Sequence, residues 1–201
     1  MRKWIVIAAL LLIALVSHAQ TTDALWSDLM SGNARFVEGN LDYSALRQLR
    51  NATAGGQSPQ TSILSCADSR VPAELIFNRS IGEFFVVRTA GNVEDTFNIA
   101  SLEYAAEHGW TKMIIVMGHS ECGAMKASMT APKPGEPTPE LYELIQRIRK
   151  SFKTPPHDLR EATIMNIEYT AEQLAKNPHL KDVLIVKALY DVATGKVERI
   201  P

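Results

Sequence analysis

The sequence contains little cysteine, no long apolar run and almost no excess of charge. Only two of its 201 residues are cysteine, and its formal net charge at pH 7 is −1. Because the basic residues are scattered along the chain, we expect no nucleic-acid-binding surface. The longest apolar run has 13 residues, whereas a membrane-spanning helix needs roughly 20. These absences argue against a nucleic-acid-binding protein and against a stable membrane anchor.

The apolar run, Trp4–Val16, lies at the N-terminus and has the pattern of a secretory signal peptide. Two cations precede it, and the small residues Ser17 and Ala19 follow it. A basic start, a short apolar stretch and small residues before a cleavage site are typical of such a peptide. We predict cleavage before Gln20 and therefore a periplasmic or secreted protein. A retained anchor is the less favoured interpretation.

The rest of the chain has the composition of one globular domain. Apolar residues make up 46% of the sequence and charged residues 21%, as is ordinary for folded domains. We find no internal repeat and no sign of a second domain. The predicted organisation is a signal peptide over residues 1–19 and a single domain over residues 20–201.

Strand-like and helix-like stretches alternate through this domain. Runs rich in Val, Ile, Leu and Phe predict strands, over residues 61–65, 83–88, 111–117 and 183–189. Helical patterns predict a helical turn or helices, over residues 72–77, 94–108, 122–129, 140–152 and 159–176. This alternation favours an α/β fold with a mostly parallel central sheet flanked by helices. Residues 196–200 are expected to form an edge strand or a hairpin partner.

The segment before the first strand is predicted to be helical and then irregular. Residues 23–38 place apolar side chains at roughly helical spacing, interrupted at Ser31–Asn33, which predicts two short helices. Residues 51–59 contain two glycines and a proline and predict a loop that leads into the sheet.

The two cysteines belong to two short polar motifs, Cys66–Arg70 (CADSR) and His119–Gly123 (HSECG). Both motifs follow predicted strands, and in parallel sheets functional side chains gather at the carboxyl ends of strands. Two thiolates and one imidazole form the ligand set of a catalytic zinc site that keeps a fourth position open. In a secreted protein the competing interpretation is a disulfide. We favour zinc, because a structural disulfide requires no polar, chemically useful neighbours.

These motifs resemble the signature of the β-class carbonic anhydrases, CxDSR followed by HxxCG. Further segments match the family in order along most of the mature chain: Leu29 with Gly32-Asn33 and Arg35-Phe36, Gln57–Pro59, Gly82-Glu83, Phe85–Arg88, Ala90–Asn92, Leu102–Tyr104 and Tyr190-Asp191. The resemblance implies an α/β fold with an N-terminal helical arm. It also implies a homodimer, or a tetramer built from dimers, whose N-terminal helices embrace the partner subunit.

The resemblance also implies roles for the residues of the two motifs. Cys66, His119 and Cys122 would bind one Zn²⁺ per subunit. Asp68 would accept a hydrogen bond from the zinc-bound water or, in a resting state, occupy the fourth coordination position itself. Arg70 would bind the Asp68 carboxylate with two hydrogen bonds, which pulls it off the metal and keeps it ionised.

The substrate site is likewise implied by the family. Phe85 and Tyr104 would line an apolar slot for CO₂. The side chain of Gln57, from the partner subunit, and the backbone N–H of Gly123 would bind an oxygen of substrate or product. Considered on their own, Phe85 and Tyr104 are also explained by core packing. Without the family match, Gln57 would be interpreted as an ordinary polar loop residue.

The function implied is the reversible hydration of CO₂ to bicarbonate and a proton, by attack of zinc-bound hydroxide on CO₂. Two alternatives remain open. The same fold and metal also serve hydrolysis of carbon disulfide or carbonyl sulfide in related proteins. In a different class, the chain would be a noncatalytic secreted module whose two cysteines form a disulfide.

Overall fold

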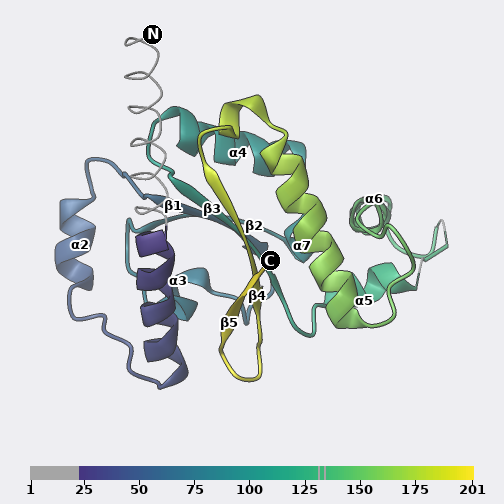
Figure 1. The fold of residues 1–201 in the computed structure, drawn as a ribbon, viewed down its shortest axis with the longest axis horizontal. Coiled ribbons are helices and arrows are strands. Elements are labelled where there is room, and N and C mark those ends of the chain that lie inside the picture. The colour runs from purple at the N-terminus through teal and green to yellow at the C-terminus, as the bar shows by residue number, and fades with distance from the viewer. Residues whose placement is uncertain (1–22, 131, 134) are drawn as a thin grey trace, which may run out of the picture.

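The computed structural model describes residues 23–130, 132–133 and 135–201, and its centre is a five-stranded sheet with helices on both faces (Figure 1). The strands are β1 (Thr61–Cys66), β2 (Phe84–Thr89), β3 (Met113–His119), β4 (Leu184–Tyr190) and β5 (Val197–Ile200). Their order across the sheet is β2-β1-β3-β4-β5. The first four strands are parallel, and β5 pairs antiparallel with β4. The predicted fold class and the predicted hairpin partner are therefore confirmed.

Helices connect the strands and cover the sheet. The first helix spans residues 23–37. The following α-helices are α2 (Leu46–Ala52), α3 (Ala73–Ile76), α4 (Thr96–Glu107), α5 (Gly123–Met129), α6 (Pro139–Arg149) and α7 (Leu159–Ala175). Two short 3₁₀ helices are η1 (Ala90–Asn92) and η2 (Pro178–Leu180). None of the helices in the described part of the chain is long and apolar enough to cross a membrane. The predicted signal peptide, residues 1–19, lies outside the described residues.

The two faces of the sheet bury separate apolar clusters. One cluster joins β1 and β3 to the helix of residues 23–37 and to α3, with Leu29 and Phe77 among its buried side chains. The other joins the opposite face to α4 and α7 through Leu102 and Ile167. Strands β1 and β3 are buried along their whole length, because helices cover both faces, and this explains their continuous apolar sequence.

The prediction of two short helices over residues 23–38 is wrong, because residues 23–37 form one continuous helix. The Ser31–Asn33 segment makes tertiary contacts and does not interrupt the helix. A Cβ at Gly32 would collide with the carbonyl oxygen of Phe77, so the glycine lets the helix pass close to α3. The Asn33 amide then bonds the carbonyl oxygens of Ile76 and Gly195, at 3.0 and 2.8 Å.

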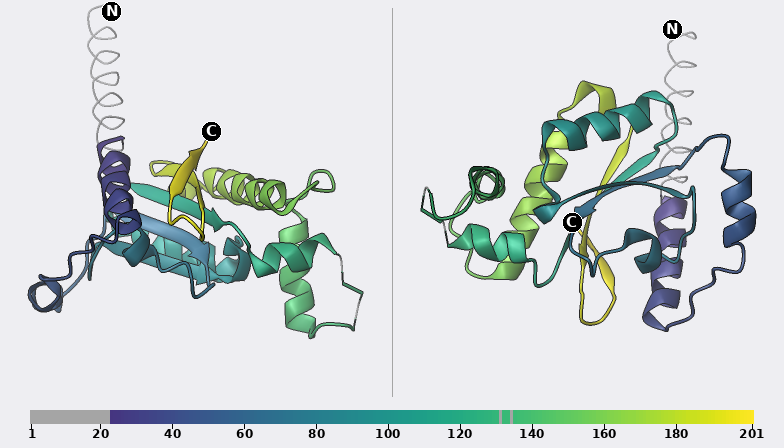
Figure 2. Two further views of the ribbon diagram at one scale, coloured as in Figure 1. Left: turned by 90° about the horizontal axis from the view of Figure 1, so that it is seen from below. Right: turned by 180° about the vertical axis from the view of Figure 1, so that it is seen from behind.

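Helix α2 was not predicted from the sequence. It has no buried residue, so it lacks the buried apolar stripe from which amphipathic helices are recognised. In Figures 1 and 2 it stands apart from the sheet, on the segment that leads into β1. The predicted loop over residues 51–59 begins at the end of this helix.

Candidate metal centre

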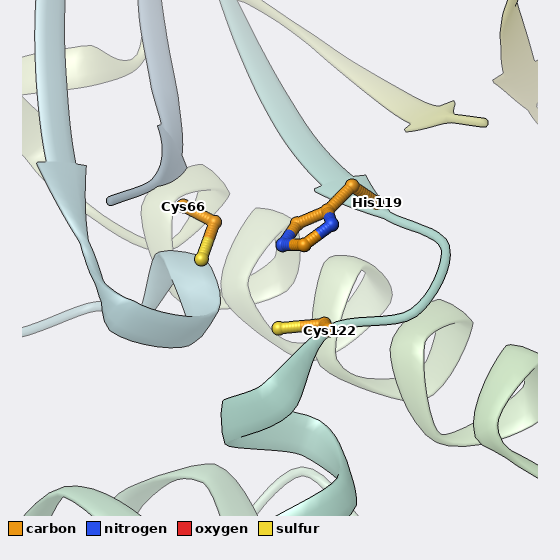
Figure 3. Close-up of side chains that lie close together, drawn as sticks. All are labelled: Cys66, His119 and Cys122. Atoms are coloured by element: carbon orange, nitrogen blue, oxygen red, sulfur yellow. The ribbon is translucent and has the colours of Figure 1, made fainter. Parts of the chain in front are cut away.

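The carboxyl ends of β1 and β3 bring the two cysteine motifs together. The two strands are parallel neighbours in the sheet, with Ser65 opposite Met117. Cys66 is the last residue of β1, His119 is the last residue of β3, and Cys122 immediately precedes α5. One ligand atom from each of these three side chains lies within 4.8 Å of the other two. All three are buried and point toward one another (Figure 3).

A tight turn between His119 and Cys122 lets both side chains face one point. Glu121, inside this turn, has a φ of 55°, a left-handed conformation that reverses the chain within a few residues. Ser120 ties the turn to the β4–β5 hairpin. Its N–H donates to the carbonyl of Tyr190 at 2.9 Å, and its Oγ accepts from the N–H of Val192 at 2.9 Å.

The imidazole of His119 is oriented as a metal ligand. Its Nδ1 lies 2.8 Å from the carbonyl oxygen of Ser120, and since a carbonyl only accepts, Nδ1 carries the proton. The lone pair is therefore on Nε2. Within the described residues this buried nitrogen has no hydrogen-bond partner. A buried polar atom without a partner is costly, and a cation between Nε2 and the two sulfurs would satisfy it.

The two thiols also favour a cation. Both cysteines are free, and the Sγ of Cys66 accepts the N–H groups of Gly91 at 3.3 Å and of Asp68 at 3.4 Å. Contact with the Cys122 thiol lowers the pKa of Cys66, although burial opposes the shift. The same contact, together with burial, raises the pKa of Cys122. Two buried thiolates repel each other, so a dication is needed for both to ionise.

This donor set fits zinc. Thiolate and imidazole are ligands that Zn²⁺ prefers, and three protein ligands leave the fourth tetrahedral position for a small molecule. The disulfide interpretation gains no support, because the structure keeps the two cysteines as separate thiols beside an imidazole.

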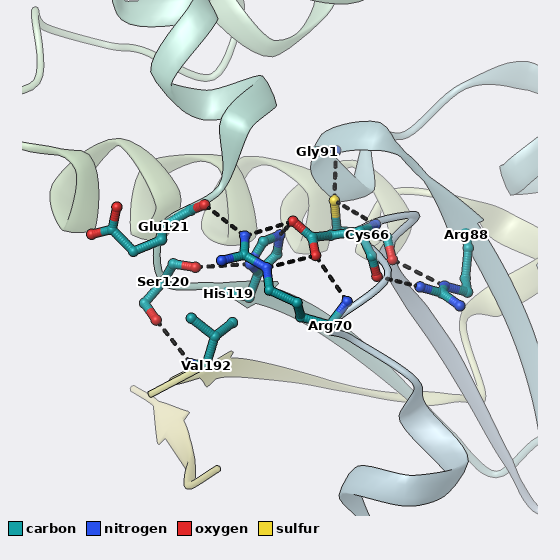
Figure 4. Close-up of polar contacts among 9 residues, drawn as sticks. Cys66, Arg70, Arg88, Gly91, His119, Ser120, Glu121 and Val192 are labelled. Carbon is teal, nitrogen blue, oxygen red and sulfur yellow. Dashed lines mark hydrogen bonds and ion pairs between the residues drawn. The ribbon is translucent and has the colours of Figure 1, made fainter. Parts of the chain in front are cut away.

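Asp68 and Arg70 form a bidentate ion pair, and Arg70 lies beside His119 (Figure 4). Arg70 donates from Nε to Oδ1 at 2.9 Å and from Nη2 to Oδ2 at 2.7 Å. Hydrogen bonds from this guanidinium hold the pKa of Asp68 well below its usual range, against a smaller effect of burial. Arg70 also donates to the carbonyl of Glu121 at 3.0 Å, so it joins the two motifs. The carboxylate Oδ2 lies 3.9 Å from Nε2 of His119.

Comparison with known proteins agrees with this geometry. The family model described as carbonic anhydrase matches residues 61–197, which include all five motif side chains described above. A carbonic anhydrase of Mycolicibacterium smegmatis is 35% identical, over 87% of this chain and 91% of that protein. The chain belongs to the β-class carbonic anhydrase family. As a member of this family, the protein is a carbonic anhydrase.

Further relatives of this carbonic anhydrase support the assignment. Carbonic anhydrase 2 of Mycobacterium tuberculosis is 41% identical over 64% of this chain and 63% of its own length. The solved structure of the β-carbonic anhydrase CcaA superimposes with a TM-score of 0.72 at 27% identity, covering 88% of this chain and 95% of that chain. The family and the fold class predicted from the sequence are both confirmed.

The residues expected to bind substrate in this carbonic anhydrase do not all lie beside the cluster. Gly123 follows Cys122 directly and starts α5. Gln57, in contrast, is exposed and precedes the amino end of β1, whereas Cys66 is at the carboxyl end. Phe85 pairs in register with Ser62, near the start of β1.

Phe85 belongs to an open aromatic cluster. Its ring centroid lies 6.3 Å from that of Tyr104, which in turn contacts His108 at 4.2 Å and Trp110 at 5.7 Å. Tyr104 is 49% exposed, so it does not have the buried packing that a core role would require. Phe85 itself is partly buried against the core beneath α4, so the cluster joins the core at Phe85 and opens to the surface at Tyr104 and His108.

Two supporting residues had no assigned role in the sequence analysis. Arg88, at the end of β2, donates to the carbonyl oxygens of Cys66 at 3.0 Å and Asp68 at 2.6 Å (Figure 4). The N–H of Gly91 donates to the Cys66 sulfur. The signal in the sequence was that both residues lie in segments that match the family, Phe85–Arg88 and Ala90–Asn92, but this match does not identify their partners.

Proposed function

We propose that this chain catalyses the reversible hydration of CO₂ to bicarbonate and a proton, with one zinc ion per subunit held by Cys66, His119 and Cys122. The observation that carries the proposal is the buried His119 Nε2, without a partner in the described residues, facing two sulfurs. When bound, zinc is a Lewis acid that makes water nucleophilic near neutral pH. Water adds through its oxygen to the carbon of CO₂, one C=O π pair moves to oxygen, and a proton leaves.

Asp68 is proposed to orient the reacting water by accepting its hydrogen bond. Because the pKa of this carboxyl is held low, it is ionised, and hence a pure acceptor, at any physiological pH. Arg70 engages both carboxylate oxygens, and this contact supports the arrangement in which Asp68 stays off the metal. Arg70 therefore acts through Asp68.

We further propose that the substrate slot is completed by a second subunit, in a homodimer or a tetramer of dimers. At about 3.3 Å per residue, the six residues of β1 span roughly 20 Å, and Gln57 precedes the amino end of this strand, whereas Cys66 ends it. Phe85 pairs with Ser62, four residues before Cys66. These side chains would therefore reach the site of a partner and not their own. The absence of any buried residue in α2 supports an N-terminal arm that packs on another chain.

Secretion is part of the proposal, and it rests on the sequence of residues 1–19 alone. The mature protein should begin at Gln20, and it should be recovered from the periplasm or the medium. Intact-mass measurement of the exported protein tests this directly. A protein that retains Met1 and stays with the membrane would contradict it.

The experiment that tests the function measures zinc content and CO₂ hydration on the same preparation. The mature chain should contain one zinc per subunit and hydrate CO₂ in a stopped-flow assay with a pH indicator. A sample treated with a chelator should lose activity and regain it when zinc is returned. Full zinc occupancy without hydration would overturn the proposed reaction, and assays with carbon disulfide and carbonyl sulfide would then identify the substrate.

A further inference from the structure

We propose that Asn166, on α7, is a positioning residue of the metal centre, which acts through Gly91 on the sulfur of Cys66. The inference rests on the proposed zinc site. It concerns a residue that lies outside both cysteine motifs and follows Cys122 by more than forty positions. Its role would be to hold a backbone donor against one of the two thiolates.

The contact chain from Asn166 to the metal centre consists of two hydrogen bonds. The Nδ2 of Asn166 donates to the carbonyl oxygen of Gly91 at 2.9 Å. The N–H of Gly91 donates to the Sγ of Cys66 at 3.3 Å. Asn166 is 2% exposed and Gly91 is also buried, so bulk water does not compete for either bond.

The backbone at Gly91 needs such an anchor. Gly91 has φ 73° and ψ 19°, and the next residue, Asn92, has φ 43°. Two consecutive left-handed residues, one of them not glycine, persist only where tertiary contacts hold them. The amide of Asn166 supplies one such contact from a helix that is 75 residues away in the sequence.

Packing restricts the turn from the other side. A Cβ at Gly91 would lie 2.7 Å from Cδ1 of Ile148 and 2.9 Å from Cε of Met125. The turn is therefore pressed between α5 and α6 on one side and held by α7 on the other. A glycine is required here both for its conformation and for its close approach to these side chains.

The consequence for the metal centre is electrostatic. A hydrogen bond to a thiolate is charge-assisted and withdraws negative charge from the sulfur. Groups that bond to metal ligands in this way tune the bound ion, and their loss commonly reduces metal affinity 10- to 100-fold. By holding the Gly91 N–H in place, Asn166 would set how strongly Cys66 donates to zinc.

A purely structural role for Asn166 makes a different prediction. If its amide only satisfies a buried carbonyl, its loss should lower the unfolding temperature and leave the metal's ligand field unchanged. Thr170 provides a matched control one turn further along α7. It is completely buried, and its Oγ1 has no hydrogen-bond partner within the described residues, so Thr170→Val removes a buried polar group without breaking a contact.

The test compares Asn166→Leu and Asn166→Ala with Thr170→Val and the wild type, each loaded with Co²⁺ in place of zinc. We expect the sulfur-to-cobalt charge-transfer band to move to longer wavelength in both Asn166 variants, since sulfur lone pairs rise in energy when a hydrogen bond is lost. Zinc affinity, measured by competition with a chelator, should fall about tenfold. Thr170→Val should match the wild type in both measurements.

The outcomes separate this inference from the proposed function. Wild-type bands and zinc affinity in both Asn166 variants would overturn the role of Asn166 and leave the zinc site standing. A wild-type protein that binds neither metal stoichiometrically would overturn the zinc site itself, and with it this inference. If Asn166→Leu does not fold, Asn166→Ala decides, because the smaller side chain also lacks the donor and avoids steric strain.

Discussion

The two ends of β1 differ in how complete a site they build. At the carboxyl end, Cys66, His119 and Cys122 are 4%, 0% and 1% exposed, and hydrogen bonds orient the first two. Near the amino end, Gln57 is exposed and Tyr104 is half exposed. One chain therefore assembles the proposed metal ligands, the metal half of the site, by itself, and it presents the residues proposed to bind substrate, the substrate half, on its surface.

This difference has a physical cause. Metal ligands must be desolvated and held rigidly, which the interior of one domain achieves through strand ends and backbone donors. A half-exposed group of aromatic rings gains its full burial only against another surface. In the proposed dimer, the aromatic cluster around Tyr104 and helix α2, which buries no residue, would be the features through which a second copy completes the site.

The largest effect on activity is expected from removing one of the three proposed zinc ligands. Cys122→Ser replaces a soft donor with a poor one, so zinc should be lost and CO₂ hydration should fall to near background. Because zinc stabilises only the folded state, the unfolding temperature should drop as well. Zinc analysis and thermal unfolding test this, with chelator-treated wild type as the control. Full zinc occupancy in the variant would refute the ligand assignment.

Asp68→Ala should separate metal binding from catalysis within the same half. The three ligands survive, so zinc content should stay near one per subunit. Turnover should fall about a hundredfold or more, since a positioned proton acceptor typically contributes that much. Arg70→Lys, which keeps the charge and loses the two-pronged geometry, should show a smaller loss. If Asp68→Ala turns over CO₂ at the wild-type rate in the stopped-flow assay, the proposed mechanism is wrong.

The substrate half can be tested by mixing two damaged subunits. Gln57→Ala alone should reduce kcat/KM by about tenfold, the range for a lost substrate contact. If Gln57 serves the partner's site, a heterodimer of Gln57→Ala and Asp68→Ala chains contains one intact site. Co-expressed chains should then be more active than the mean of the two parents. Activity equal to that mean would place Gln57 in its own subunit's site.

The smallest effect is expected at a surface that belongs to neither half. Arg160 and Glu198 form an exposed ion pair between α7 and β5. Such pairs contribute under about 1 kcal/mol, so Arg160→Ala should barely change the free energy of unfolding in urea or the rate of CO₂ hydration. Arg160 also lines a cavity of about 340 Å³ next to Ser120 and Glu121. A large loss of activity would show that this cavity influences the metal half.

Local patterns predicted most of the secondary structure. Strands β1 and β3 and helix α7 were predicted within two residues of their observed bounds. Burial on both faces gives the two strands continuous apolar runs, and the helix has apolar residues at helical spacing. Helix α2 was missed because it buries nothing. The prediction wrongly divided the helix of residues 23–37 at Gly32. This position requires glycine because the backbone of Phe77, far along the chain, lies against it.

The sequence by itself determined the chemistry of this protein: two thiols, one imidazole and the Asp68–Arg70 pair, in motifs that follow buried strands and identify the family. The tertiary structure decided what no local pattern contains. It joined β1 to β3 so that the ligands meet, turned Nε2 of His119 toward the sulfurs, and placed the amide of Asn166 against Gly91. It also placed Gln57 beyond the amino end of β1. Spacing along a chain specifies local periodicity, whereas contacts between distant segments depend on how the whole sheet packs.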